Sequence, residues 1–205
     1  MLPHEIERES FRIIRTELGP HPFSEEQLEV VVRVIHATAD FDFGRVLRFH
    51  PQAVSQGIAA LRRGCAVVTD VQMVQVGITA DLLTRLGGRT ICDIKDSTVA
   101  ETARQLGLTR ACVSMRQNAR YLHNGIAAIG NAPTALLEVI RLVRQEGIRP
   151  ALIVGVPVGF VKAAEAKDEL LTLDVPYITA VGRKGGSSVA VATINALLRL
   201  AAANG

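Results

Sequence analysis

An apolar stretch near the amino terminus contains a histidine that could exchange a proton and two charged residues that could tune its pKa. Residues 30–43 read VVVRVIHATADFDF, and Arg33, His36 and Asp40 follow one another at intervals of three and four. On a helix these side chains share one face, where Arg33 would lower the pKa of His36 and Asp40 would raise it. Such a histidine suits general acid–base catalysis. The structural alternative is a core histidine satisfied by a neighbour and flanked by solvated charges.

Other chemistry has weaker support in the sequence. His4, His21, His50 and His123 fall near predicted loops or element ends and form no metal-ligand spacing. The three cysteines are widely spaced without a CxxC pair, so neither a zinc site nor a disulfide framework is indicated. The sequence has no GxSxG, HExxH, Walker A or GxGxxG motif, which disfavours the corresponding hydrolases and nucleotide sites. By elimination, His36 is the leading acid–base candidate.

The segment that carries His36 has clear helical boundaries. Ser24 followed by Gln27 forms a capping box, which predicts a helix beginning there and ending near residues 40–42. An earlier helix is predicted over residues 5–18 and is ended by Gly19-Pro20, and a third follows Pro51 and stops at Gly64.

From residue 65 onward, short apolar runs alternate with helical patterns. Strands are predicted at residues 65–69, 89–94, 125–129, 151–156 and 177–181. Helices are predicted at residues 71–87 in two pieces, 98–107, 109–123, 133–146, 162–173 and 187–203. This alternation predicts a single α/β domain over residues 1–205, a three-layer α/β/α unit with a five-stranded parallel sheet, Rossmann-like, with N-terminal helices.

A sheet of this kind binds ligands outside the carboxyl ends of its strands. Asp70 follows the first predicted strand, and capping of the next turn is its structural alternative. Asn131 and Pro133 follow the third strand in the pattern of an N-cap and a first-turn proline. The loop GRKGGSS follows the fifth, where glycines, a helix start, Arg183 and Lys184 suit a phosphate or carboxylate. A tight turn with two exposed cations explains that loop equally well.

Composition narrows the class of partner. The chain has 205 residues, 48% of them hydrophobic, which is enough for one substantial core. Its net charge is +3, its arginines are scattered and its aromatic content is 4%, so we expect no nucleic acid. The excess positive charge suits a small anionic ligand, or it has no functional meaning. A charged amino terminus and the lack of an 18-residue apolar run predict no secretory signal and no membrane span, and therefore a cytoplasmic protein.

Six segments carry a resemblance that covers nearly the whole chain. They are RESFRIIRTEL (8–18), VVRVIHATAD (31–40), VVTDVQMV (67–74), AIGNAPTALLEVIRL (128–142), VGVPVGFVKAAEAK (154–167) and GRKGGSSVAVATINALL (182–198). Together they closely resemble the precorrin-8X methylmutase family, the corrin-ring methylmutases of cobalamin biosynthesis.

The resemblance implies an isomerase that needs no cofactor. It would move a methyl group from C-11 to C-12 of precorrin-8X or cobalt-precorrin-8, giving hydrogenobyrinic acid or cobyrinic acid. The family's catalytic histidine falls on His36, as proton donor and acceptor. A homodimer is expected, and the partner molecule is a tetrapyrrole polycarboxylate. The predicted substrate-binding residues, from the resemblance and from the strand ends, are Ser10, Arg15, Arg33, Asp70, Thr79, Arg110, Asn131 and Lys184.

Two questions stay open at this level. A non-catalytic carrier that binds hydrogenobyrinic acid would use the same pocket, and it differs only in whether His36 must exchange a proton. The sequence also does not decide whether the substrate carries cobalt, since it shows no ligand set of its own for that metal.

Overall fold

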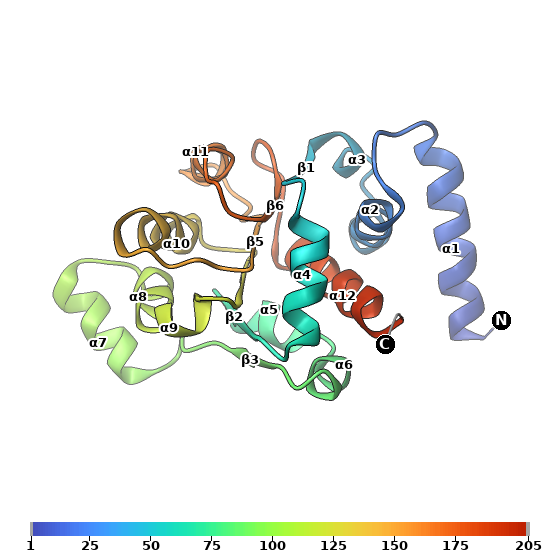
Figure 1. The fold of residues 1–205 in the computed structure, drawn as a ribbon. Coiled ribbons are helices and arrows are strands. Elements are labelled where there is room, and N and C mark those ends of the chain that lie inside the picture. Colours follow the sequence, from blue (N-terminus) through green and yellow to red (C-terminus); the bar gives the residue numbers. More distant parts are fainter. Residues whose placement is uncertain (1, 204–205) are drawn as a thin grey trace.

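A single mixed sheet organises the protein, whose computed structural model describes residues 2–203. Within these residues the sheet has six strands in the order β1-β6-β5-β4-β2-β3 (Figure 1). The strands are β1 Leu47–Phe49, β2 Ala66–Thr69, β3 Arg89–Ile91, β4 Ile126–Ile129, β5 Leu152–Gly155 and β6 Tyr177–Ala180.

The five predicted parallel strands are confirmed, but the predicted strand count is too low by one. Strands β2 to β6 pair in parallel, and each begins within one residue of its predicted start. The additional strand, β1, pairs antiparallel with β6 at the sheet edge, where Leu47 lies opposite Ala180. Its three residues are too few to show the alternation that marks a strand in a sequence. An antiparallel edge strand on an otherwise parallel sheet is common.

Helices cover both faces of the sheet, as the three-layer prediction requires (Figure 1). One face carries α4 Ala53–Arg62, α5 Gln72–Gly77, α6 Ala80–Arg85 and α12 Ser187–Ala203. The other face carries α8 Arg110–Gln117, α9 Ala119–Leu122, α10 Pro133–Glu146 and α11 Ala163–Leu170, with α7 Ser97–Leu106 packed on α8. Successive strand residues alternate between the two cores, so Val67 belongs to the first and Val68 to the second.

The N-terminal helices extend the α12 side. Helix α2, Glu25–Thr38, packs on α12, and α1, Pro3–Leu18, packs on α2 as the outermost element (Figure 1). Helix α2 begins as predicted, because Ser24 and Gln27 make the reciprocal bonds of a capping box. The short α3, Phe43–Val46, then leads into β1.

One predicted helix is divided in the structure. Residues 109–123 form α8 and α9, which meet at the buried Asn118. Its side-chain amide donates to Asp93 and to the carbonyl of Ser114, and this competition with the backbone breaks the helix. No helix within residues 2–203 is both long enough and apolar enough to cross a membrane.

Candidate functional site

The sheet has its switch point between β2 and β4, and Asp70 stands directly at it. The Asp70 carboxylate is fully buried and accepts three backbone N–H groups, from Gly130 at 3.2 Å, Asn131 at 2.8 Å and Ala132 at 2.7 Å. Burial raises the pKa of Asp70 above its ordinary value although these bonds lower it. Asp70 therefore fixes the backbone of the loop after β4 from the protein interior, and its carboxylate oxygens are not accessible at the surface.

The predicted cap of α10 differs in the structure. Pro133 is the first residue of α10 as expected, but the N-cap is Ala132 and makes no side-chain cap bond. Asn131 lies one position earlier, because the Asp70 carboxylate already satisfies the N–H groups that begin this turn. The Asn131 side chain is left exposed at the carboxyl edge of the sheet.

Three loops meet at this edge because glycines allow close backbone contact. The Gly186 N–H donates to the Val156 carbonyl at 2.9 Å, which joins the loops after β6 and β5. A Cβ on Gly130 would lie 2.7 Å from the Cα of Ser187, so the loops after β4 and β6 also touch. Gly185 has φ 159° and a Cβ there would lie 2.2 Å from the Val156 carbonyl oxygen. The edge is thus a continuous surface built largely from backbone.

Lys184 joins the end of α2 to this edge. Its Nζ lies 2.6 Å from carboxylate oxygens of both Asp40 and Asp42, and these bonds raise the pKa of Lys184 and lower that of Asp40. The expected effect of Asp40 on His36 is therefore wrong. Helix α2 ends at Thr38 and the chain turns through a left-handed Ala39, φ 52°, so Asp40 leaves the helical face and meets Lys184.

His36 lies in the last turn of α2 and is exposed, not buried as its apolar surroundings in the sequence indicated. The buried face of α2 is formed by other residues, including Val31, Val34 and Ile35. The imidazole meets the ring of Phe11 on α1 edge-on, with 5.2 Å between centroids and 76° between planes. This contact orients His36 while leaving it accessible to a ligand.

Arg33 lies one turn before His36 and is largely buried between α1 and α2. Its side chain is 15% exposed, its Nη1 lies 3.2 Å from the Glu7 carboxylate, and its guanidinium carbon lies 4.9 Å from the centre of the Phe11 ring. Burial, with the nearby Arg199 charge, lowers the pKa of Arg33. Phe11 therefore contacts both Arg33 and His36.

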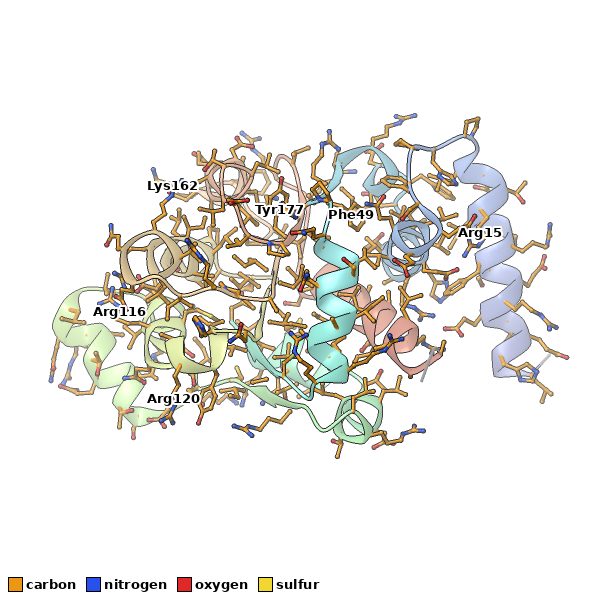
Figure 2. The ribbon with its side chains drawn as sticks, viewed as in Figure 1. Arg15, Phe49, Arg116, Arg120, Lys162 and Tyr177 are labelled. Carbon is orange, nitrogen blue, oxygen red and sulfur yellow. The ribbon has the colours of Figure 1, made fainter. Side chains whose placement is uncertain are left out.

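A cavity of about 460 Å³ opens beside this pair. It is lined by His4, Glu7, Arg8, Phe11, Arg12, Arg15, Arg33 and Arg199. Arg15 projects from α1 to α2, where it pairs with Glu29 at 2.5 Å (Figure 2). Five arginines face one glutamate in the lining, so the cavity suits a ligand with several carboxylates. Ser10 lies on the same helix, and its hydroxyl donates to the Ile6 carbonyl.

Thr79 and Arg110 lie on opposite sides of the sheet. Thr79 precedes α6, and its N–H donates to the Asn195 side chain of α12 at 2.9 Å. Arg110 begins α8, directly after Thr109, whose hydroxyl is 2.7 Å from that of Thr134 at the start of α10. The structure therefore does not bring these two predicted contacts together within one chain.

Several residues at the site have no signature in the sequence. Glu7, Phe11 and Arg199 come from helices other than α2, and only the packing of α1 and α12 on α2 brings them to Arg33. Lys167 of α11 is fully buried, and its Nζ donates to the Lys184 carbonyl at 2.8 Å. Over residues 2–203, no three His, Cys, Asp or Glu side chains are grouped so as to hold a metal ion.

Comparison with known proteins identifies the family. The family described as precorrin-8X methylmutase matches residues 5–200. The cobalt-precorrin-8 methylmutase of Priestia megaterium is 54% identical over 97% of this chain and 88% of its own, and that of Leptospira interrogans is 50% identical over 100% and 96%. A solved precorrin-8X methylmutase from Thermus thermophilus has a TM-score of 0.91 at 41% identity, covering 98% of each chain. The chain therefore belongs to the precorrin-8X methylmutase family, isomerases of cobalamin biosynthesis.

Proposed function

We propose that this chain moves the methyl group of precorrin-8X or cobalt-precorrin-8 from C-11 to C-12, with His36 as the proton donor and acceptor. The observation that carries the proposal is the position of the imidazole. His36 is exposed and contacts Phe11, and Phe11 also lines the arginine-rich cavity. A macrocycle whose carboxylates enter that cavity would therefore lie within reach of His36.

The reaction breaks the bond between the methyl carbon and C-11 and forms one to C-12, with no net change in composition. Protonation of the macrocycle at a nitrogen or carbon draws electron density away from the migrating centre and lowers the barrier. The proton returns to His36 as the product forms. An exposed imidazole can do both, since its ring nitrogens can donate and accept a proton, and the Phe11 ring orients it.

Substrate carboxylates are assigned first to Arg15 and Arg33, which share the cavity. Ser10, Thr79, Arg110 and Asn131 remain predicted contacts with other parts of the macrocycle. Lys184 is already paired with Asp40 and Asp42, so we assign it mainly to holding the end of α2 against the loop after β6. Asp70 supports the adjoining loop from within.

Two points extend the proposal. The relatives from Priestia megaterium and Leptospira interrogans are both named for the cobalt-containing substrate, which favours that form here. We also propose a homodimer, because large apolar side chains of the loop after β5 stand exposed at the carboxyl edge; these are Val158, Phe160 and Val161. Their exposure would be costly in a monomer.

Incubation of the purified protein with precorrin-8X and, separately, cobalt-precorrin-8 tests the activity through the change in absorbance. In the same assay, His36→Ala is expected to lose a factor of about 100 to 10,000 in rate. Affinity for the product should change little, because one neutral hydrogen bond contributes only about 1 kcal/mol. His21→Ala is the matched control, since His21 is also exposed and also contacts a phenylalanine ring, that of Phe23.

The outcomes separate the candidate roles. Turnover by His36→Ala within about threefold of the unmodified chain would exclude His36 as the proton carrier. Parallel loss of rate and product affinity would indicate that His36 positions the ligand. Tight binding of hydrogenobyrinic acid without conversion of either substrate by the unmodified chain would instead support the non-catalytic carrier.

A further inference from the structure

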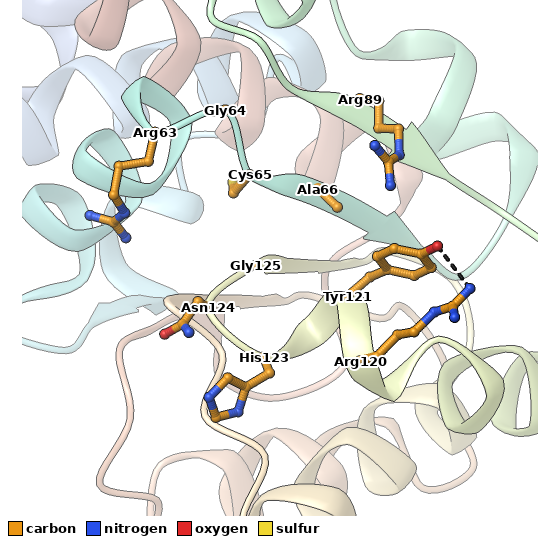
Figure 3. A pocket seen from close by; sticks show the side chains of 10 residues that line it. All are labelled: Arg63, Gly64, Cys65, Ala66, Arg89, Arg120, Tyr121, His123, Asn124 and Gly125. Atoms are coloured by element: carbon orange, nitrogen blue, oxygen red, sulfur yellow. Dashed lines mark hydrogen bonds between the residues drawn. The ribbon is translucent and has the colours of Figure 1, made fainter.

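A second basic hollow lies at the opposite edge of the sheet, where strands β2, β3 and β4 begin (Figure 3). This amino-edge pocket has a volume of about 420 Å³. It is lined by Arg63, Gly64, Cys65, Ala66, Arg89, Arg120, Tyr121, His123, Asn124 and Gly125. The loops after β4, β5 and β6 follow the carboxyl ends of the strands, and the cavity beside α1 has a different lining, so the amino-edge pocket shares no residue with either.

The pocket lining carries positive charge without any carboxylate. Arg63, Arg89 and Arg120 are all exposed, and none lies within salt-bridge distance of a carboxylate in residues 2–203. Arg63 has a structural explanation, because it ends α4 and offsets the negative end of that helix dipole. Arg89 and Arg120 have no such explanation, since Arg89 begins a strand and Arg120 lies in the four-residue α9.

Tyr121 holds these two arginines in place. The guanidinium carbons of Arg89 and Arg120 lie 5.3 Å and 4.5 Å from the centre of the Tyr121 ring. Arg120 Nη2 also donates to the Tyr121 hydroxyl at 2.8 Å, as Figure 3 shows. These contacts with the Tyr121 ring restrict both guanidinium groups, so less entropy is lost when their remaining N–H groups bind a ligand. The pair is therefore pre-organised for an anion.

The other side of the pocket supplies further donors. The Arg149 N–H donates to His123 Nδ1 at 3.3 Å, which leaves the proton of a neutral His123 on Nε2 as a donor. The floor is open because it contains Gly64 and Gly125. A Cβ on Gly125 would lie 2.0 Å from the Tyr121 carbonyl oxygen, so no side chain can fill that position.

We propose that the amino-edge pocket binds a small molecule carrying two or more phosphate or carboxylate groups. Arg89 and Arg120 would hold one anionic group on the Tyr121 side, and Arg63 and the His123 side would hold another (Figure 3). Planar guanidinium groups bind both kinds of oxyanion through paired N–H groups. The ligand would bind independently of the macrocycle, because the amino-edge pocket shares no lining residue with the cavity assigned to the substrate carboxylates.

Calorimetric titration with pyrophosphate and, separately, with citrate tests the proposal and distinguishes the two ligand chemistries. Replacement of both arginines, in Arg89→Gln/Arg120→Gln, is expected to weaken binding by about tenfold or more, because it removes the charged donors on the Tyr121 side of the pocket. Arg104→Gln is the matched control, since Arg104 is an exposed arginine already paired with Glu101 on α7. Arg33→Gln controls for binding in the cavity beside α1.

Binding of pyrophosphate alone, citrate alone or both, lost in the double variant and kept in both controls, supports the pocket and names its chemistry. Failure of both anions to bind the unmodified chain at millimolar concentration overturns the proposal. Equal affinity in the double variant also overturns it, and loss in Arg33→Gln would place the binding in the other cavity. Thermal unfolding of each variant without ligand confirms that it is folded.

Discussion

At the scale of single residues, Arg33 offers the sharpest test of substrate recognition. Its guanidinium is held by Glu7 and by the Phe11 ring, and it lines the cavity proposed for substrate carboxylates. Arg33→Gln is expected to weaken binding of hydrogenobyrinic acid by about tenfold or more, because it removes a charged, geometrically fixed donor. Absorbance titration measures the affinity.

Glu7→Gln provides the control for that change. It removes the ion pair but keeps the guanidinium, so affinity should be retained or rise as Arg33 becomes available to the ligand. If both variants lose affinity equally, Arg33 acts through the packing of α1 on α2 and not through direct contact with the substrate.

The residues of the site could be predicted only in part. His36 and Arg33 were recognisable because their spacing and apolar surroundings are local features of α2. Their partners were not, since Glu7 and Phe11 belong to α1 and reach Arg33 only through helix packing. The exposure of His36 was missed for the same reason. The residues around His36 predict an apolar helix, but they do not show which face of that helix α12 covers.

At the scale of elements, the buried Lys167 links α11 to the loop that carries Lys184. Its Nζ donates to the Lys184 carbonyl at 2.8 Å, and no salt bridge to a carboxylate in residues 2–203 offsets its burial. Burial lowers the pKa of Lys167 from 10.5 to about 8. We expect Lys167→Met to keep or raise the thermal midpoint at pH 7, since it removes a buried cation. Methylmutase turnover should fall, because the loop loses its support.

The pH dependence of stability gives a separate readout for Lys167. Between pH 8 and pH 10.5 the unfolded chain binds more protons at this residue than the folded chain, so stability rises with pH in this window. The rise should be smaller in Lys167→Met when thermal unfolding is followed across that range. A variant with unchanged turnover would show that the loop does not depend on this bond.

Glu138 of α10 forms an ion pair with Arg116 of α8, and its protonation is expected to lower the stability of the fold in acid. It is 4% exposed and lies 2.8 Å from Arg116 Nε and 2.6 Å from Arg141 Nη2. Burial alone would raise the pKa of Glu138, but hydrogen bonds from Arg116 and Arg141 lower this pKa from 4.5 to about 2. Its ion pairs therefore stabilise the fold fully above pH 4.5, by about 3 kcal/mol, and this contribution is lost as the pH falls toward 2.

Urea unfolding at pH 6 and pH 3 measures the contribution of the Glu138 ion pairs to the free energy of unfolding. The difference in unfolding free energy between the unmodified chain and Glu138→Gln should shrink toward the lower pH. Glu101→Gln serves as the comparison, because Glu101 makes an ion pair with Arg104 on the surface of α7, where solvent screens it. A difference that is the same at both pH values would contradict the assigned titration.

The elements were more predictable than their contacts. Helices α10 and α12 have the predicted bounds, because a proline start and a glycine-rich loop mark them locally. Strand β1 could not be predicted, since three residues carry no period and its pairing with β6 depends on a segment about 130 residues later. The break at Asn118 depends on a side-chain bond to Asp93, which is likewise a tertiary contact.

At the scale of the whole molecule, basic groups gather at two distant places. One is the cavity between α1, α2 and α12, and the other is the amino-edge pocket. The modest net charge of +3 conceals this arrangement, because it sums positive and negative side chains over the whole sequence. Both cores are built on one sheet.

The loop after β5 carries the prediction of a homodimer. Val158 is 47% exposed, Phe160 83% and Val161 80%, all within one short segment. Arg183 lies over the Phe160 ring, with 5.4 Å between its guanidinium carbon and the ring centre. Single exposed apolar residues are ordinary, but three within four residues are unusual, and they are the reason for which we propose that a second copy of the chain covers this surface.

Phe160→Asp/Val161→Asp is expected to convert the dimer to a monomer in light scattering after gel filtration. Burying one such side chain contributes about 1.5 to 3 kcal/mol, and a twofold axis counts each residue twice, so the dissociation constant should rise by at least about a hundredfold. Leu106→Asp is the control, since Leu106 is 53% exposed as a more isolated residue at the end of α7. It should leave the oligomeric state unchanged. A monomeric unmodified chain at tens of micromolar would refute the homodimer itself, whereas a double variant that stays dimeric would move the interface away from this loop.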